Sequence, residues 1–174
     1  MNPVYPLQRH CFWDVIKLRT EARNVKDKAY KIPYTYKGKD YGVITALPWN
    51  EFTPELAKFR ESFLEHNPLD WGEYAVSYMW IDSDYPWHVD NEVTKSQHNR
   101  KGVKCALNII LEGHSTAVEY EDGRKYIYEA AVINTSELHR VIPADERVMA
   151  RISFKDKTFK EVVEGIKEWQ GKNI

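Results

Sequence analysis

The regular spacing of turn-forming residues constrains the fold of this chain more than any other feature. Between residues 74 and 154, short apolar or alternating runs are interrupted by turn signals roughly every eight to twelve positions. Runs of that length are typical of strands rather than helices, and their spacing favours an antiparallel sandwich or barrel. The strands that we expect are Tyr74–Ile81, Lys104–Leu111, Thr116–Glu121, Arg124–Asn134 and Arg147–Phe154.

Two amphipathic segments predict helices on either side of these strands. Thr53-Pro54 begins the first helix, with threonine as N-cap and proline at the first helical position, and Asn67-Pro68 ends it. The second helix, residues 158–171, opens with a Thr-x-x-Glu capping box. Each segment carries an apolar stripe, which we expect to pack against the outside of the barrel.

The N-terminal part of the chain gives weaker signals. Residues 1–30 hold short apolar runs that are compatible with either strand or helix, whereas residues 34–44 predict a hairpin that turns near Gly38. A chain of 174 residues is expected to form one domain, residues 1–174. Within it we expect N-terminal strands and a supporting helix in 1–70, the core in 74–154, and the C-terminal helix in 158–171.

The composition argues against several classes of partner. Lys and Arg number 25 against 26 Asp and Glu, for a net charge of −1, so no nucleic-acid partner is expected. No apolar run is long enough to span a membrane, and the N-terminus lacks the features of a secretory signal. We therefore expect no membrane association and a cytoplasmic location. Cys11 and Cys105 have neither disulfide nor metal-ligand spacing, and the oligomeric state stays open.

Two histidines and one aspartate have the residue types and the spacing of a metal site. His88 and Asp90 are two apart on an extended segment, so their side chains point the same way. His139 follows 49 positions after Asp90, far enough for the intervening strands to cross the sheet and return. A His-x-Asp tripeptide alone is a weak signal. With the second histidine and the surrounding strands, it indicates the facial triad of non-haem Fe(II) oxygenases, which leaves three coordination positions open.

Arg151 and Ser153 repeat the two-residue spacing on the last predicted strand. A planar, permanently charged guanidinium is suited to binding a carboxylate through two hydrogen bonds. An unpaired buried arginine would be very costly, so Arg151 meets either a ligand carboxylate or a buried Asp or Glu, and the nearby triad favours the ligand. Arg147 is the alternative, but it follows Asp145-Glu146 in a predicted turn and is expected to be solvated.

Asn108 is an unusual residue in a strongly apolar strand. Strand alternation places it on the same face as Ala106 and Ile110, opposite Leu107 and Ile109. A buried asparagine needs a hydrogen-bond partner. Asn108 therefore lies either at an end of the barrel, satisfied by backbone or water, or inside the barrel against a bound co-substrate.

At these residues the chain resembles the 2-oxoglutarate- and Fe(II)-dependent oxygenases, and within them the prolyl-hydroxylase-like branch. The resemblance covers about Tyr74 to Phe154. The matching positions are Tyr78 and Tyr85 before His88-x-Asp90, Leu107-Asn108 followed by Gly113 and Thr116, and Leu138-His139-Arg140-Val141 followed by Pro143 and Arg151-x-Ser153. The double glycine usual in that branch is here Gly113-His114.

The resemblance implies a fold, a cofactor and a reaction. The fold would be a double-stranded β-helix, a jelly roll like that of cupins: mainly β, with about eight strands in two facing sheets and flanking helices on one of them. His88, Asp90 and His139 would bind Fe(II). Arg151, helped by Ser153 and by Tyr78 and Asn108, would bind 2-oxoglutarate. Dioxygen would then oxidise a C–H bond of the substrate to an alcohol, with release of succinate and CO2.

The substrate is less defined by the sequence. Tyr85 and Trp87 crowd the metal motif and are candidates to line the substrate entrance. His98 lies in a polar stretch, residues 91–102, which forms either a mobile loop or a lid that closes over substrate. A peptidyl side chain, a free amino acid and a small metabolite all stay possible substrates.

Two other classes of function compete with the oxygenase interpretation. One is a metal-binding cupin of another activity, although such cupins usually carry a His-x-His pair that this chain lacks. The other is a non-catalytic binding or sensing barrel with a degenerate site. The complete set of three ligands and an arginine argues against the second class, because a fold could lose any of them without harm.

Overall fold

The computed structural model describes residues 2–7, 13–47, 52–65, 70–82, 85–90, 94–95, 102–115, 117–142 and 145–172. Over these ranges the chain forms twelve strands, three α-helices and one short 3₁₀ helix. In chain order they are β1 (Val4–Pro6), α1 (Val15–Val25), the 3₁₀ helix Lys26–Lys28, β2 (Tyr30–Tyr36), β3 (Lys39–Ala46), α2 (Pro54–Glu65), β4 (Tyr74–Ile81), β5 (Tyr85–His88), β6 (Thr94–Lys95), β7 (Cys105–Glu112), β8 (Ala117–Tyr120), β9 (Lys125–Tyr126), β10 (Ala130–Ile133), β11 (His139–Ile142), β12 (Arg147–Phe154) and α3 (Phe159–Lys172).

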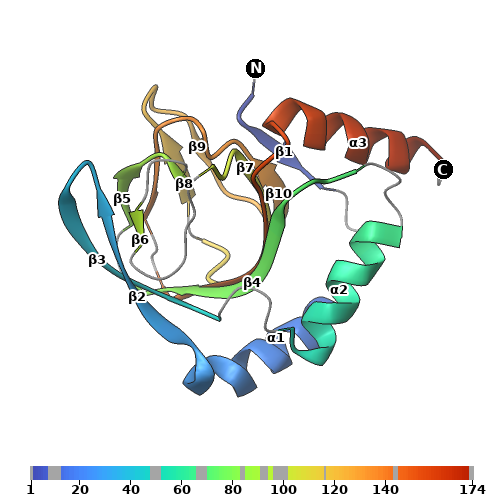
Figure 1. Ribbon diagram of the computed structural model, residues 1–174, viewed down its shortest axis with the longest axis horizontal. Helices are drawn as coiled ribbons and strands as arrows, with labels where there is room; N and C mark the ends of the chain where they lie inside the picture. The colour runs from blue at the N-terminus through green and yellow to red at the C-terminus, as the bar shows by residue number, and fades with distance from the viewer. Residues whose placement is uncertain are drawn as a thin grey trace.

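The strands form two antiparallel sheets that face each other. The larger sheet has the order β1-β10-β7-β12-β4-β3-β2-β6, and the smaller has the order β5-β11-β8-β9. All three α-helices lie outside the larger sheet, while the smaller sheet closes the other side of the interior (Figure 1). This is the jelly-roll architecture that the family resemblance implied, in agreement with the sandwich or barrel that the strand spacing favours, with helices packed on one of its two sheets.

Most of the predicted strands are confirmed, and one is wrong. Tyr74–Ile81 and Arg147–Phe154 coincide with β4 and β12. The predicted strand Arg124–Asn134 is instead divided between the two sheets, because β9 pairs with β8 and β10 pairs with β7. The residues between them carry the chain from one sheet to the other, and Ile127 is accordingly 66% exposed.

The two faces of the larger sheet bury different sets of side chains. Its outer face packs against the helices, where Leu56, Phe59 and Phe63 of α2 are almost completely buried. Each such side chain contributes about 1.5–3 kcal/mol to folding. The inner face contributes Met79, Ile110 and Met149 to a second core shared with the smaller sheet. The alternation of β12 therefore turns Arg147, Met149, Arg151 and Ser153 toward the interior.

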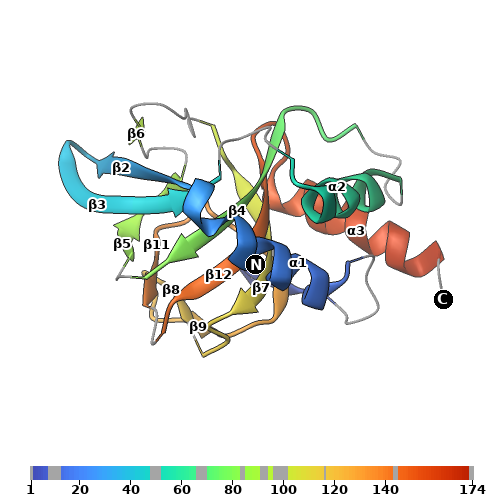
Figure 2. The same ribbon diagram turned by 90° about the horizontal axis from the view of Figure 1, so that it is seen from below.

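The N-terminal segment forms a helix that supports the larger sheet. Asp14 caps α1 by accepting hydrogen bonds from the backbone of Ile16 and Lys17, which resolves the ambiguous apolar run as a helix. The helix lies across the outer face near β7 (Figure 2), and Arg19 of α1 donates a 2.7 Å hydrogen bond to the carbonyl of Leu111. The predicted hairpin is also confirmed as β2 and β3, which turn at Lys37-Gly38 with positive φ angles.

The starts of the other two helices test the predicted caps. Glu21 of α1 accepts the first free amides of α2, from Glu55 and Leu56, and Thr53 donates its hydroxyl to the same carboxylate. Thr53 is the N-cap residue as predicted, because Pro54 opens the helix and the Thr53 carbonyl accepts from Ala57 N–H, but the free amides are capped by Glu21 and not by the Thr53 hydroxyl. The capping box of α3 is confirmed by the Thr158–Glu161 hydrogen bonds. None of the described helices is long and apolar enough to cross a membrane.

Candidate metal centre

His88, Asp90 and His139 come together at the smaller sheet. β5 and β11 are antiparallel neighbours, and His88 pairs directly with His139. Asp90 follows β5, and its backbone N–H donates to the carbonyl of Thr135 at 3.0 Å. Asp90 Oδ1 lies 3.1 Å from His88 Nε2 and 3.9 Å from His139 Nε2. The potential ligand atoms all lie within 4.8 Å of one another, and the three residues are at most 2% exposed.

Both imidazoles are oriented by the same kind of backbone contact. His88 Nδ1 lies 2.7 Å from the carbonyl of Pro86, and His139 Nδ1 lies 2.8 Å from the carbonyl of Glu137. A carbonyl oxygen can only accept a hydrogen bond, so both Nδ1 atoms carry the proton. Both Nε2 atoms therefore direct a lone pair at the Asp90 oxygen whenever the rings are neutral. Three electron-rich atoms turned toward one another repel unless a cation lies among them.

The surroundings keep the metal-ligating forms of these groups at neutral pH. Burial lowers the pKa of His139 to about 3, and His88 beside it acts in the same direction. Burial alone would raise the pKa of Asp90, but the Arg151 guanidinium holds it well below its ordinary value. A neutral imidazole and a carboxylate are the forms that bind a metal ion.

Arg151 pairs with the aspartate of this cluster. Its Nη2 donates to Asp90 Oδ2, and its Nε donates to Ser153 Oγ at 2.9 Å. Of the two partners that the sequence allowed, a ligand carboxylate or a buried acidic residue, the structure contains the second. Arg151 and Ser153 therefore contact each other inside the barrel as predicted, but the guanidinium already holds a carboxylate of the protein.

Arg147 contradicts the prediction that it is solvated. It is 1% exposed and is the largest fully buried side chain among the described residues. Its Nη2 donates to the hydroxyl of Tyr128 at 2.6 Å, and its Nε and Nη1 have no hydrogen-bond partner in the described part of the chain. Residues 147 and 151 are four apart on one strand, so their side chains point to the same face of the sheet. This alternation places Arg147 in the interior despite the polar turn before it.

Tyr128 and Asn108 complete a polar group around Arg147. Asn108 Nδ2 donates to the Tyr128 hydroxyl at 3.0 Å, so that hydroxyl accepts from two side chains. Asn108 is 2% exposed, and its Oδ1 has no partner among the described residues. Of the two positions that the sequence allowed for Asn108, the structure shows the one inside the barrel. Tyr128 was missed because it lies between the short strands β9 and β10, outside any regular alternation.

A single cavity between the sheets joins the metal cluster to this polar group. The two imidazoles, both buried arginines, Asn108 and Tyr128 all line it, and apolar side chains form the rest of its wall. Tyr85 also lines the cavity, and its ring lies edge-on to His88 with centroids 4.2 Å apart. The prediction that Tyr85 lies beside the metal motif is consistent with this position.

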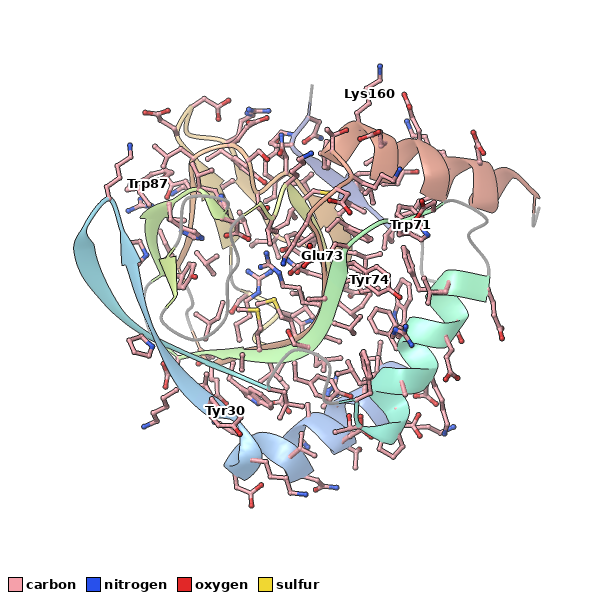
Figure 3. The ribbon with its side chains drawn as sticks, in the orientation of Figure 1. Tyr30, Trp71, Glu73, Tyr74, Trp87 and Lys160 are labelled. Atoms are coloured by element: carbon pink, nitrogen blue, oxygen red, sulfur yellow. The ribbon has the colours of Figure 1, made fainter. Side chains whose placement is uncertain are left out.

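Neither Trp87, a candidate for the substrate entrance, nor Tyr78, a candidate contact of the co-substrate, lines the cavity. Three steps along β5 from Tyr85 to His88 oppose two steps along β11, so β5 is bulged and both end residues point inward. Trp87 instead packs under the Arg140 guanidinium, which is bonded to Glu119 (Figure 3).

Tyr78 faces the helices on the outer side of β4. Its hydroxyl donates to Glu21 of α1 at 2.7 Å, and its ring belongs to the core under the helices, as do Trp71 and Tyr74 (Figure 3). Its neighbour Met79 belongs to the inner core. Tyr78 is therefore removed from the candidate site. His98, Thr116 and Pro143 lie outside the described residues.

Comparisons with known proteins support the fold. No protein-family model matches the chain, and no curated protein sequence matches it. A prolyl-4-hydroxylase from Pseudomonas putida superposes with a TM-score of 0.52, covering 89% of this chain and 93% of that protein at 15% identity. AviO1 from Streptomyces viridochromogenes gives a TM-score of 0.38 at 14% identity, covering 83% and 84% of the two chains. A cupin-2 domain protein from Shewanella frigidimarina gives 0.35 at 14% identity, covering 51% and 76%. At these identities, the likeness to the hydroxylase concerns the fold.

Proposed function

We propose that this protein is an Fe(II)- and 2-oxoglutarate-dependent dioxygenase that hydroxylates a C–H bond of its substrate. One observation carries the proposal. Two members of the buried His-Asp-His cluster, His88 and His139, line the same cavity as Arg147, a buried arginine that has no carboxylate partner among the described residues. A metal site and a cationic site in one cavity match the chemistry of a co-substrate that carries both a chelating group and a second carboxylate, and the cavity of about 20 Å³ must widen to admit it.

The metal would be held by His88 Nε2, Asp90 Oδ1 and His139 Nε2. Two imidazoles and a carboxylate suit Fe(II), and as a facial set they leave three positions for exogenous ligands. The donor set of this chain fits the ion because three lone pairs converge in a buried site, where Arg151 is bonded to the second oxygen of Asp90 and not to the converging atoms. Bound Fe(II), with 2-oxoglutarate and dioxygen, supplies the oxidising chemistry.

The protein's part is to bind and orient the co-substrate. The keto acid end of 2-oxoglutarate would take two of the open metal positions. In this proposal its far carboxylate pairs with Arg147 rather than with Arg151, because Arg151 is already bonded to Asp90. Arg147 Nε and Nη1 are available to the carboxylate, and Asn108 and Tyr128 hold the polar end of the cavity.

The walls of the cavity would exclude water from the reacting atoms. Tyr85 packs against His88, and Val118, Ile133, Val141 and Met149 line the same space. A dry site strengthens the ionic contacts to the co-substrate and protects reactive species from side reactions. We keep a peptidyl side chain, a free amino acid and a small metabolite as candidate substrates, and a cytoplasmic location as the expected one.

Anaerobic titration of the Fe(II) protein with 2-oxoglutarate tests this function. We expect a weak visible charge-transfer band in the wild type, because the keto acid chelates the iron. The band should require far more 2-oxoglutarate in Arg147→Met, while iron binding survives. If the wild type gives no band and no heat of binding by calorimetry, the protein is a cupin of another activity or a non-catalytic barrel.

A further inference from the structure

Asp90 divides its two carboxylate oxygens between different partners. Oδ1 faces the imidazoles, at 3.1 Å from His88 Nε2 and 3.9 Å from His139 Nε2. Oδ2 accepts from Arg151 Nη2. The side chain is 1% exposed, so no bulk water competes for either oxygen. The carboxylate is therefore presented to the metal position through one oxygen, while the other is bonded to a cation.

The guanidinium of Arg151 is itself held in place. Its Nε donates to Ser153 Oγ at 2.9 Å, and the residue is 6% exposed. β12 lies inside the larger sheet, where Arg151 is paired with Ser77 of β4 on one side and with Asn108 of β7 on the other. A backbone fixed on both sides and a second hydrogen bond leave the head group little freedom to leave Asp90.

This division matters because a carboxylate can bind a metal ion through one oxygen or through both. Two histidines and a carboxylate bound through one oxygen leave three of six positions open. If Oδ2 also bound, two would stay open. A chelating co-substrate would then fill both, and no position would remain for dioxygen.

We propose that Arg151 is a positioning residue that keeps Asp90 bound to the metal through Oδ1 alone, and so preserves the third open position. The proposal rests on the metal site of the proposed function, but not on the identity of the co-substrate. Outer contacts of this kind orient metal ligands in many proteins. Arg147 and Arg151, four residues apart on one face of β12, thus have separate tasks: one binds the co-substrate and the other fixes a metal ligand.

The test counts the water molecules on bound Mn(II), by water-proton relaxation, in the metal-loaded protein without co-substrate. We expect three waters in the wild type and two in Arg151→Met, which removes the donor but keeps an unbranched chain of similar length. Arg151→Lys retains one donor and should restore the third water. Arg140→Met, which removes an arginine on the outer side of the smaller sheet, is the matched control and should keep three.

A crystal structure of the Mn(II)-loaded wild type gives a second measurement that does not depend on any variant folding. We expect Asp90 Oδ1 on the metal and Oδ2 on Arg151. The inference is overturned if Arg151 turns away from Asp90 in that structure, or if Arg151→Met keeps three waters with Asp90 bound through one oxygen.

The same samples separate this inference from the proposed function. Three waters that 2-oxoglutarate fails to displace would end the proposed function and leave the role of Arg151 intact. Three waters retained in Arg151→Met, with 2-oxoglutarate still displacing two of them, would end the inference and leave the function intact.

Discussion

Arg147→Met should affect ligand binding and stability in opposite directions. The guanidinium is 1% exposed, makes one hydrogen bond to Tyr128, and has two nitrogens without a partner in the described part of the chain. A side chain in that state costs free energy in the unliganded protein. Methionine has a similar unbranched length and no polar group, so it removes that cost together with the cation.

The two effects can be estimated from the contacts. Replacing a whole buried ion pair by apolar side chains of similar volume is often neutral or stabilising by about 1–4 kcal/mol, and Arg147 has no ion-pair partner among the described residues that its replacement would leave unpaired. For a chain of this size, each kcal/mol raises the melting temperature by about 2–4 °C. A hydrogen bond to a charged group contributes about 1.5–3 kcal/mol. Losing two of them to the far carboxylate costs at least about 3 kcal/mol, or on the order of a hundredfold in affinity.

Two assays on the same samples measure these effects. Thermal unfolding without co-substrate should show Arg147→Met melting as high as the wild type or several degrees higher. Anaerobic calorimetry of the Fe(II) protein should show 2-oxoglutarate binding weakened about a hundredfold. Arg140→Met is the control. Arg140 forms an ion pair with Glu119 and does not line the cavity, so its replacement should leave the affinity for 2-oxoglutarate unchanged. A lower melting temperature combined with unchanged affinity would refute the argument, because Arg147 would then be a structural residue.

Three further predictions concern the metal ligands, the pH dependence and Tyr78. His88→Ala and Asp90→Ala should each abolish stoichiometric metal binding, measured by metal analysis, and keep the far-UV dichroism of the wild type; full metal occupancy in both would disprove the assignment. The pKa of His139 is lowered from 6.5 to about 3, so the unfolded chain takes up a proton at this ring before the metal-free folded protein does. The free energy of unfolding should therefore be constant with respect to this group above about pH 6.5, and should fall by up to about 1.4 kcal/mol per pH unit as the pH falls from there toward 3. Urea unfolding between about pH 4.5 and 7 should reveal that slope, and an equal slope in His139→Asn would contradict it. Tyr78→Phe should lose about 1 kcal/mol of stability, because Glu21 loses a donor, and should bind 2-oxoglutarate like the wild type; a large loss of affinity would return Tyr78 to the site.

The sequence predicts the His-Asp-His cluster well because the chemistry of a metal site limits the residue types. His88, Asp90 and His139 had to be two imidazoles and a carboxylate, and their spacing had to fit strands that return to the same place. The positions of strands β4 and β12 followed from apolar runs bounded by turn residues. These features depend on residue type and on distance along the chain, both of which a sequence states directly.

The orientation of individual side chains was harder to predict. β4 is buried on both faces, so its apolar residues give no signal of which face is inner, and Tyr78 was assigned to the wrong one. Arg147 was misjudged from its acidic neighbours, although its phase relative to Arg151 indicated the interior. The orientation of Trp87 depended on a bulge, which Pro86 is compatible with but does not specify, because proline also occurs on regular edge strands such as β5.

That bulge gives the site some tolerance to the number of residues between Tyr85 and His88. Pro86 and Trp87 together oppose Arg140, and the bulge is what allows Tyr85 and His88, three positions apart, to face the same cavity. Removing either middle residue would leave Tyr85 and His88 two positions apart, and regular pairing would then place both side chains on the same face without a bulge. Over Tyr85–His88 we therefore expect replacement of either middle residue, or deletion of one of them, to keep metal binding. Natural variation in chain length at this point would be a weaker sign of a lost site than replacement of His88 itself.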